Sequence, residues 1–321
     1  MLCIYRPAAV EHTLRLRSDY RYPMLRIALF FATNIAILVV ISIVFSLLGL
    51  EGILAENQVD LNLQALLVMS AVIGFSGSFI SLALSKWMAK RSMGVQLIDP
   101  QQPLNETERW LLSTVQRQAQ QANIGMPEVG IFDSPSPNAF ATGARRNNAL
   151  VAVSVGLMQN MKQDEVEAVL AHEVSHVANG DMVTMALIQG VMNTFVIFLS
   201  RLVGFFVDRV LLKNDRGLGI GYYLSSIVAQ IFLGCLASII ILWFSRRREF
   251  RADAGSAKIA GTGKMVAALK RLQAGHGEAG LAEPMTSFGI AGKDKGGFAD
   301  LFLSHPPLEK RIAALESRRL A

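Results

Sequence analysis

The fold is decided at residues 166–177, which read VEAVLAHEVSHV. Apolar residues recur there every three or four positions, which is the spacing of one face of a helix. Asp164 and Glu165 precede the stretch and suit the first turn of a helix, where carboxylates are stabilised by the helix dipole. Gly180 is well placed to end it. We therefore predict a helix over residues 162–179.

The predicted helix carries two histidines on one face. His172 and His176 are four residues apart, about one turn, so both imidazoles can reach one zinc ion. Glu173 lies beside them and is placed to act as a general base on a water molecule. This pattern alone is also compatible with two ordinary buried or surface histidines and a solvated glutamate. A third ligand is therefore the decisive question.

Glu249 is the candidate for that third ligand, because a catalytic zinc needs three protein ligands and one open position. Asp253 follows four residues later, so both carboxylates share a face if this segment is helical. Asp253 can then accept a hydrogen bond from the distal nitrogen of a zinc-bound histidine. The competing interpretation makes Glu249 an interfacial residue that neutralises the basic cluster at 246–248.

The composition points to a membrane. Of 321 residues, 52% are hydrophobic and 17% are charged, compared with about 25% charged residues in soluble proteins. Four apolar stretches are long enough to span a bilayer, at residues 27–50, 61–85, 182–200 and 217–245. The last two fit a full or a partly sunken hairpin, because Arg201 interrupts the third and the fourth contains Gln230 and several small residues. We interpret Gly74 and Gly77 as lipid-facing rather than as a helix contact.

The basic residues indicate the orientation. They flank the first span on its N-terminal side and follow the second and fourth spans, whereas the loop at 51–60 is acidic. The positive-inside rule therefore places both termini and the polar segments in the cytoplasm, although the basic connection at 209–216 does not fit. The net charge of +6 is thus explained without nucleic acid, and the two cysteines imply no disulfide.

The expected fold class is a mainly α membrane protein with four transmembrane helices in two hairpins. A zincin-like α+β cytoplasmic catalytic domain is expected to be split by the second hairpin. Within that domain we expect a helix over 105–123, strands at 128–132 and 149–155, and a mobile glycine-rich loop at 275–297. The predicted segments are an N-terminal extension at 1–23, hairpins at 24–91 and 182–245, and catalytic parts at 92–181 and 246–321.

Four motifs together resemble the HtpX family of bacterial membrane zinc proteases, which is related to the CAAX prenyl proteases. They are His-Glu-x-x-His at 172–176, Glu-x-x-Ala-Asp at 249–253, and the segments 138–143 and 304–311. The resemblance extends from residue 24 to the C-terminus. It implies one Zn²⁺ per chain, held by His172, His176 and Glu249, with Glu173 as the general base.

The resemblance also implies roles for residues outside the two helices. His305 matches a histidine that can donate to the oxyanion of the tetrahedral intermediate, with a plain loop histidine as the equal alternative. Arg311 is expected to orient that motif or to support Asp253, or else to lie on a helix surface. An extended edge over residues 138–142 is expected to pair with the substrate backbone through Asn138, Ala139, Phe140 and Ala141.

The implied function is a zinc endopeptidase embedded in the bacterial cytoplasmic (inner) membrane. Its expected partners are the lipid bilayer and membrane or misfolded polypeptides, cleaved at the cytoplasmic face during stress-linked quality control. An intramembrane protease is disfavoured by the charged start of the helix at 162–179, and a prenyl-peptide protease by the small number of spans. A non-enzymatic zinc-binding scaffold would leave Glu173 without a purpose.

Overall fold

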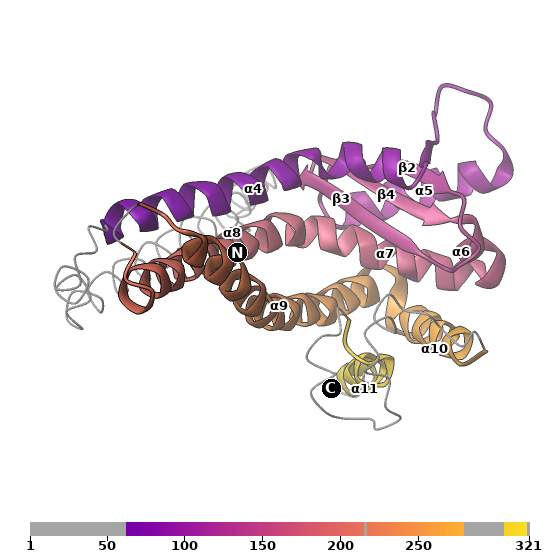
Figure 1. Cartoon of the computed structure of the whole chain (residues 1–321). Helices are drawn as coiled ribbons and strands as arrows, with labels where there is room; N and C mark the ends of the chain where they lie inside the picture. Colours follow the sequence, from indigo (N-terminus) through magenta and orange to yellow (C-terminus); the bar gives the residue numbers. More distant parts are fainter. Residues whose placement is uncertain (1–61, 215–216, 279–304, 320–321) are drawn as a thin grey trace, which may run out of the picture.

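A computed structural model describes residues 62–214, 217–278 and 305–319 (Figure 1). The predicted segments at 1–23 and 27–50 lie outside the described residues, as do residues 279–297 of the predicted loop. The described chain forms three long helices that extend from one side of a small sheet, with shorter helices packed around the sheet (Figure 1). The long helices and the sheet meet where the candidate site lies.

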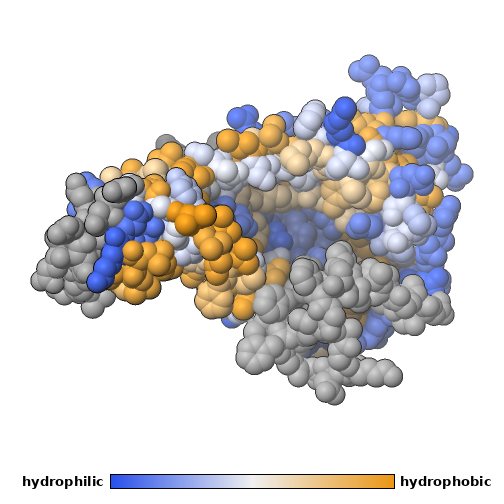
Figure 2. All heavy atoms as spheres, in the orientation of Figure 1, coloured by the Kyte–Doolittle hydropathy of each residue, from blue (hydrophilic) through white to orange (hydrophobic). Residues whose placement is uncertain are grey.

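The three long helices are apolar. They are α4 (Leu63–Ser92), α8 (Asp181–Phe205, continued by the π-helical turn η1, Phe206–Leu211) and α9 (Ile220–Ser256). Each is long and apolar enough to cross a membrane. α8 packs against both α4 and α9. Hydrophobic side chains gather over this end of the molecule, whereas hydrophilic side chains are most frequent at the other end (Figure 2).

The contact between α4 and α8 corrects the interpretation of Gly74. A Cβ added to Gly74 would lie 2.7 Å from the backbone nitrogen of Thr194 and 2.9 Å from the carbonyl oxygen of Gly190. The two helices therefore approach through their backbones, as small residues allow in membrane helix pairs. Among the described residues, no heavy atom lies within 4 Å of a Cβ added to Gly77, and its lipid-facing interpretation stays a prediction.

The helices α8 and α9 are longer than the apolar stretches that predicted them. Arg201 does not end α8, because its guanidinium donates a hydrogen bond of 2.9 Å to the Tyr222 hydroxyl on α9. α9 continues without a break through the basic cluster, so Glu249 and Asp253 lie on the same helix as the apolar segment.

The sheet has four strands in the order β1-β2-β4-β3. β2 (Glu128–Phe132) and β4 (Asn148–Ser154) are parallel and match the predicted strands to within a residue. β3 (Ala139–Arg145) pairs antiparallel with β4 and forms one edge. β1 (Gln96–Leu97), at the other edge, has only two residues and was not predicted. Within the described residues no strand pairs with the outer edge of β3, which lies beside the helices (Figure 1).

Shorter helices cover the sheet and build the core. They are α5 (Glu106–Gln121), α6 (Val155–Asn160), α7 (Gln163–Asn179), α10 (Thr262–Glu278, after the π-helical turn η2, Ala257–Gly261) and α11 (Leu308–Arg319). A capping box between Asn105 and Glu108 begins α5, as that sequence predicts. The predicted loop at 275–297 starts too early, since residues 275–278 belong to α10. The buried core includes Leu111, Val115, Val151, Val153, Leu170, Val174, Leu269 and Leu315.

Candidate metal centre

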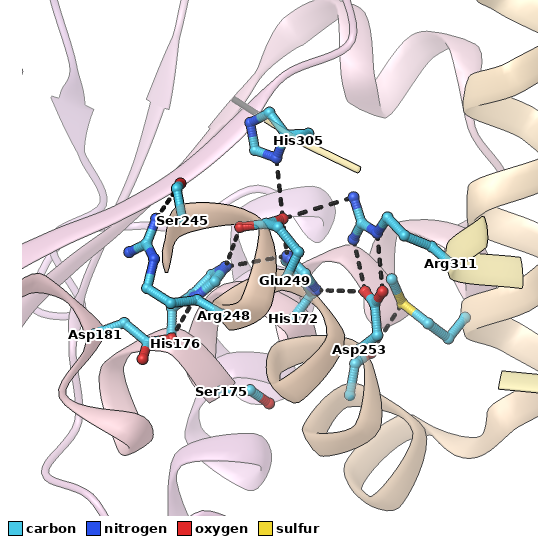
Figure 3. Close-up of polar contacts among 12 residues, drawn as sticks. His172, Ser175, His176, Asp181, Ser245, Arg248, Glu249, Asp253, His305 and Arg311 are labelled. Atoms are coloured by element: carbon cyan, nitrogen blue, oxygen red, sulfur yellow. Dashed lines mark hydrogen bonds and ion pairs between the residues drawn. The ribbon is translucent and has the colours of Figure 1, made fainter. Parts of the chain in front are cut away.

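Two helices bring the three candidate ligands together. His172 and His176 come from α7, and Glu249 comes from α9 (Figure 3). The Nε2 atoms of the histidines are 3.2 Å apart. The Glu249 carboxylate lies 3.4 Å from each of them, through Oε2 to His172 and Oε1 to His176. All three side chains are buried.

These spacings fit a tetrahedral metal ion. Ligand atoms about 2.0–2.1 Å from a tetrahedral ion are about 3.3–3.4 Å from one another. The two histidine nitrogens are 3.2 Å apart, and each lies 3.4 Å from a different oxygen of the Glu249 carboxylate. Burying two imidazole nitrogens that face each other beside a carboxylate is costly unless they have a favourable partner. A metal ion bound between them would provide that partner. The donor set of two nitrogens and one carboxylate oxygen can therefore hold a metal ion.

Each histidine is oriented by a second carboxylate. Nδ1 of His172 lies 3.0 Å from Oδ1 of Asp253, and Nδ1 of His176 lies 2.7 Å from Oδ2 of Asp181. Both carboxylates are buried. A hydrogen bond at Nδ1 fixes the tautomer and turns Nε2 toward the metal position.

Asp181 was not among the residues predicted from the sequence. Gly180, with φ of +69°, ends α7 and turns the chain into α8, so that Asp181 comes back beside His176. Glycine adopts this left-handed conformation without the strain that other residues incur. The available signal was a carboxylate at the very start of a predicted membrane segment, where a charge without a partner would be costly.

Arg311 on α11 holds Asp253 in place. Its guanidinium donates two hydrogen bonds to that carboxylate, Nε to Oδ2 at 2.8 Å and Nη2 to Oδ1 at 2.6 Å. Nη1 also lies 3.6 Å from Oε2 of Glu249. Both partners of the bidentate pair are buried, so the structure places Arg311 within the site and not on a helix surface (Figure 3).

His305 is also brought to the site. Its Nδ1 lies 3.0 Å from Oε2 of Glu249, and its side chain is 64% exposed. The exposure leaves the imidazole open to solvent on the side away from the carboxylate. The structure thus places His305 at the rim of the site, in contact with a candidate ligand, while its role toward a substrate remains a prediction.

Glu173 faces a cavity of about 370 Å³ that the candidate ligands His172 and Glu249 also line. Burial raises the pKa of Glu173, although the nearby histidines act in the opposite direction. A hydrogen bond from the backbone N–H of Ala141 also favours the ionised form. A carboxylate with a raised pKa at this position is suited to accept a proton near neutral pH and to pass it on.

The predicted substrate-pairing residues lie along β3. Asn138 bonds to Ser154 through both its backbone groups, its carbonyl accepting from the Ser154 N–H and its N–H donating to the Ser154 hydroxyl, each at 2.9 Å. Hydrogen-bonded pairs alternate along antiparallel strands, so Phe140 also turns toward β4. Ala139 and Ala141 consequently direct their backbone groups to the free edge, beside the cavity that Asn138 and Ala139 line.

When no metal is bound, the two histidines hold protons tightly. Burial by itself lowers their pKa values, but hydrogen bonds with Asp181 and Glu249 outweigh it and raise the pKa of His176 to about 9. Asp253 and Glu249 likewise raise the pKa of His172. A protonated imidazole cannot bind a metal, so metal and protons compete at these nitrogens.

Metal affinity is therefore expected to rise with pH up to about 9, the pKa of His176. Below that pH, each displaced proton makes the apparent affinity rise about tenfold per pH unit. Calorimetric titration of the metal at pH 7.5, in two buffers of different ionisation enthalpy, counts the protons released. We expect at least one per metal ion, and binding without proton release would contradict this assignment.

Replacing Asp181 with Asn is expected to weaken metal binding about 10–100-fold, because His176 loses the carboxylate that orients it. The measurement is a competition titration against a chelating dye. The matched control is Asp164→Asn, at the exposed start of α7, the helix that carries His176. This variant should bind metal as the wild type does. Equal affinities for all three proteins would show that Asp181 does not position His176.

The two histidines on one helix, the carboxylate from a second helix and the three helices apolar enough to span a membrane are the features of a membrane metallopeptidase. Residues 105–319 match the model of peptidase family M48, and the chain belongs to this family. It is 63% identical over 294 residues to Protease HtpX of Thioalkalivibrio sulfidiphilus (strain HL-EbGR7), covering 92% of this chain and 99% of that protein. It is 64% identical over 293 residues to Protease HtpX of Pseudoalteromonas atlantica, covering 91% of this chain and 99% of that protein. The predicted resemblance to HtpX is confirmed.

A solved structure supports the fold. The crystal structure of S. mikatae Ste24p superposes with a TM-score of 0.57 at 18% sequence identity. The likeness covers 78% of this chain and 58% of the Ste24p chain, so this chain spans less than two thirds of that protein. At this identity the comparison establishes a shared fold and nothing about substrates.

Proposed function

We propose that the protein is a zinc-dependent endopeptidase of the bacterial cytoplasmic (inner) membrane that cleaves membrane or misfolded polypeptides at the cytoplasmic face, in quality control under stress. The observation that carries the proposal is the cluster of His172, His176 and Glu249, whose candidate ligand atoms all lie within 4.8 Å of one another, next to the cavity that Glu173 lines. The high identity to proteins named Protease HtpX supports it.

The proposed division of labour follows from the contacts. His172, His176 and Glu249 hold the zinc ion, which when bound polarises a carbonyl group and lowers the pKa of water. Glu173 removes the proton from the attacking water and delivers it to the departing amine. Its burial favours the second transfer, because a carboxyl with a raised pKa more readily keeps the proton after taking it from water and before giving it to the amine.

The substrate is proposed to add a strand to the free edge of β3. The outward backbone groups of Ala139 and the carbonyl of Ala141 would pair with it, while the Ala141 N–H donates to Glu173. Such pairing carries affinity without demanding a particular side chain. This mode suits an enzyme that accepts many unfolded chains. His305, exposed at the rim, is placed to donate to the oxyanion once it moves from Glu249.

The orientation is proposed from the charges at the helix ends near the sheet. Lys86 and Lys90 lie in the last two turns of α4, and the basic cluster at 246–248 follows the apolar part of α9. Basic residues gather on the cytoplasmic side of membrane helices. Residues 92–181 and 246–321 would then form one cytoplasmic catalytic domain, on either side of the hairpin of α8 and α9.

Adding zinc back to chelator-treated protein tests the proposal. Full-length protein in detergent is expected to bind one zinc ion per chain and to regain cleavage of casein, an unfolded substrate, in proportion to the zinc bound. Magnesium, which prefers oxygen ligands, should not restore cleavage. A protein that binds no zinc would refute the proposed metal centre, and stoichiometric zinc without cleavage would argue against a broad endopeptidase.

A further inference from the structure

A second cavity, of about 670 Å³, lies away from the one that Glu173 lines. It opens between the β3–β4 turn, the junction of α7 and α8, and α9. Its charged lining residues are three arginines, Arg145, Arg146 and Arg251, and no carboxylate is among the described residues that line it. Arg145 and Arg251 are exposed, and none of the described carboxylates forms an ion pair with either. The cavity is therefore strongly cationic.

The same cavity presents unused hydrogen-bond donors. Nδ2 of Asn179 is buried there and has no hydrogen-bond partner among the described residues. α8 begins at this point without a side-chain cap, and its first residues, Met182 and Val183, line the cavity. Uncapped N–H groups at a helix N-terminus favour a bound anion. The N-terminus of α8 therefore adds to the arginines, and the Asp181 carboxylate in its first turn is engaged with His176.

One wall of the cavity is mainly apolar. Met182, Val183 and Leu187 lie along the first two turns of α8, which then continues as an apolar helix able to cross a membrane. β3, which leads into the arginine-bearing turn, contacts both α4 and α8. Arg251 lies on α9 six residues after Ser245, the last residue before the basic cluster. The cavity is thus placed where the apolar helices emerge from the bilayer.

We propose that this cavity binds the phosphate headgroup of an anionic phospholipid from the leaflet next to the catalytic domain. Arg145 and Arg251 would hold the phosphate, and the apolar start of α8 would contact the glycerol backbone and the upper part of the acyl chains. Basic pockets between membrane helices recognise anionic headgroups in this way. The proposal depends on the membrane insertion of α8 and α9 and is independent of the peptidase activity.

Lipid binding to full-length protein in detergent tests the proposal, measured by native mass spectrometry with phosphatidylglycerol and with phosphatidylcholine of the same acyl chains. We expect preferential binding of phosphatidylglycerol. The double variant Arg145→Gln/Arg251→Gln should weaken that binding at least tenfold. Arg91→Gln/Arg247→Gln removes two exposed charges beside the same membrane helices but outside the cavity, and should change it less than twofold.

Four results would overturn the proposal, three of them from lipid binding and one from labelling. If both double variants lose phosphatidylglycerol binding equally, the lipid is attracted by surface charge in general and not by this cavity. If phosphatidylglycerol and phosphatidylcholine bind equally well, the protein has no preference for the anionic headgroup. Displacement of phosphatidylglycerol by millimolar inorganic phosphate would make a free anion the ligand. Photoactivatable phosphatidylglycerol on the wild-type protein gives a readout that needs no variant. It should label peptides containing residues 142–147 or 179–187, and labelling confined to other segments would contradict the site.

Discussion

Replacing Glu173 with Gln is expected to reduce kcat/KM for casein cleavage by about 10²–10⁴-fold while one zinc ion per chain stays bound. The amide has the shape of the carboxylate but cannot accept the proton of the attacking water. The candidate ligands His172, His176 and Glu249 are untouched by the change, so metal content should not fall. Cleavage and bound zinc are measured on the same preparation.

The control for this variant is Glu106→Gln, in the exposed first turn of α5 and remote from the cavity, which should cleave casein like the wild type. The result also separates an enzyme from a zinc-binding scaffold. A scaffold has no use for a general base, so full retention of the protein's cellular function by Glu173→Gln would favour it. Loss of zinc from this variant would instead mean that Glu173 takes part in holding the metal.

Replacing Arg311 with Ala is expected to lower the free energy of unfolding by about 3–5 kcal/mol, because the buried Asp253 carboxylate loses its bidentate partner. For a chain of this size that corresponds to a melting temperature lower by roughly 6–20 °C. Activity should also fall, since Asp253 would no longer be fixed against His172. The measurement is thermal unfolding in detergent at a fixed zinc concentration.

Lys310→Ala is the matched control for Arg311→Ala. Lys310 is the preceding residue on α11 and is exposed, so its removal should change the unfolding free energy by no more than about 0.5 kcal/mol. Arg311→Lys should lie between the two, because it keeps the charge but not the two parallel hydrogen bonds. If Arg311→Ala has the same melting temperature as Lys310→Ala, the Asp253–Arg311 pair does not stabilise the fold.

Much of the candidate site could be predicted from the sequence because its geometry is local. His172, Glu173 and His176 are placed by the period of one helix, and Glu249 and Asp253 by the period of another. Pairing the two helices required only that a membrane hairpin return the chain to the side it left. Asp181 escaped prediction because its contact with His176 depends on the left-handed turn at Gly180, which no periodicity reports.

The membrane part was predicted less accurately, for a related reason. Hydropathy records where charges occur but not whether a partner on another helix accommodates them, so Arg201 shortened the expected span although it bonds to Tyr222. The contact at Gly74 depends on which helix lies opposite, and that is set by tertiary packing. The faces and caps of a helix are determined by a few neighbouring residues. The helix that packs against it is determined by residues far apart in the sequence.

The unbroken course of α9 has a consequence for biosynthesis. Glu249 reaches the two histidines only when α9 lies antiparallel to α8, and these helices are the apolar pair between His176 and Glu249. A chain emerging from the ribosome can form α7 early, but it cannot assemble the three ligands until both apolar helices are in place. The peptidase is therefore expected to remain inactive during its own synthesis and to acquire its metal only after entering the bilayer.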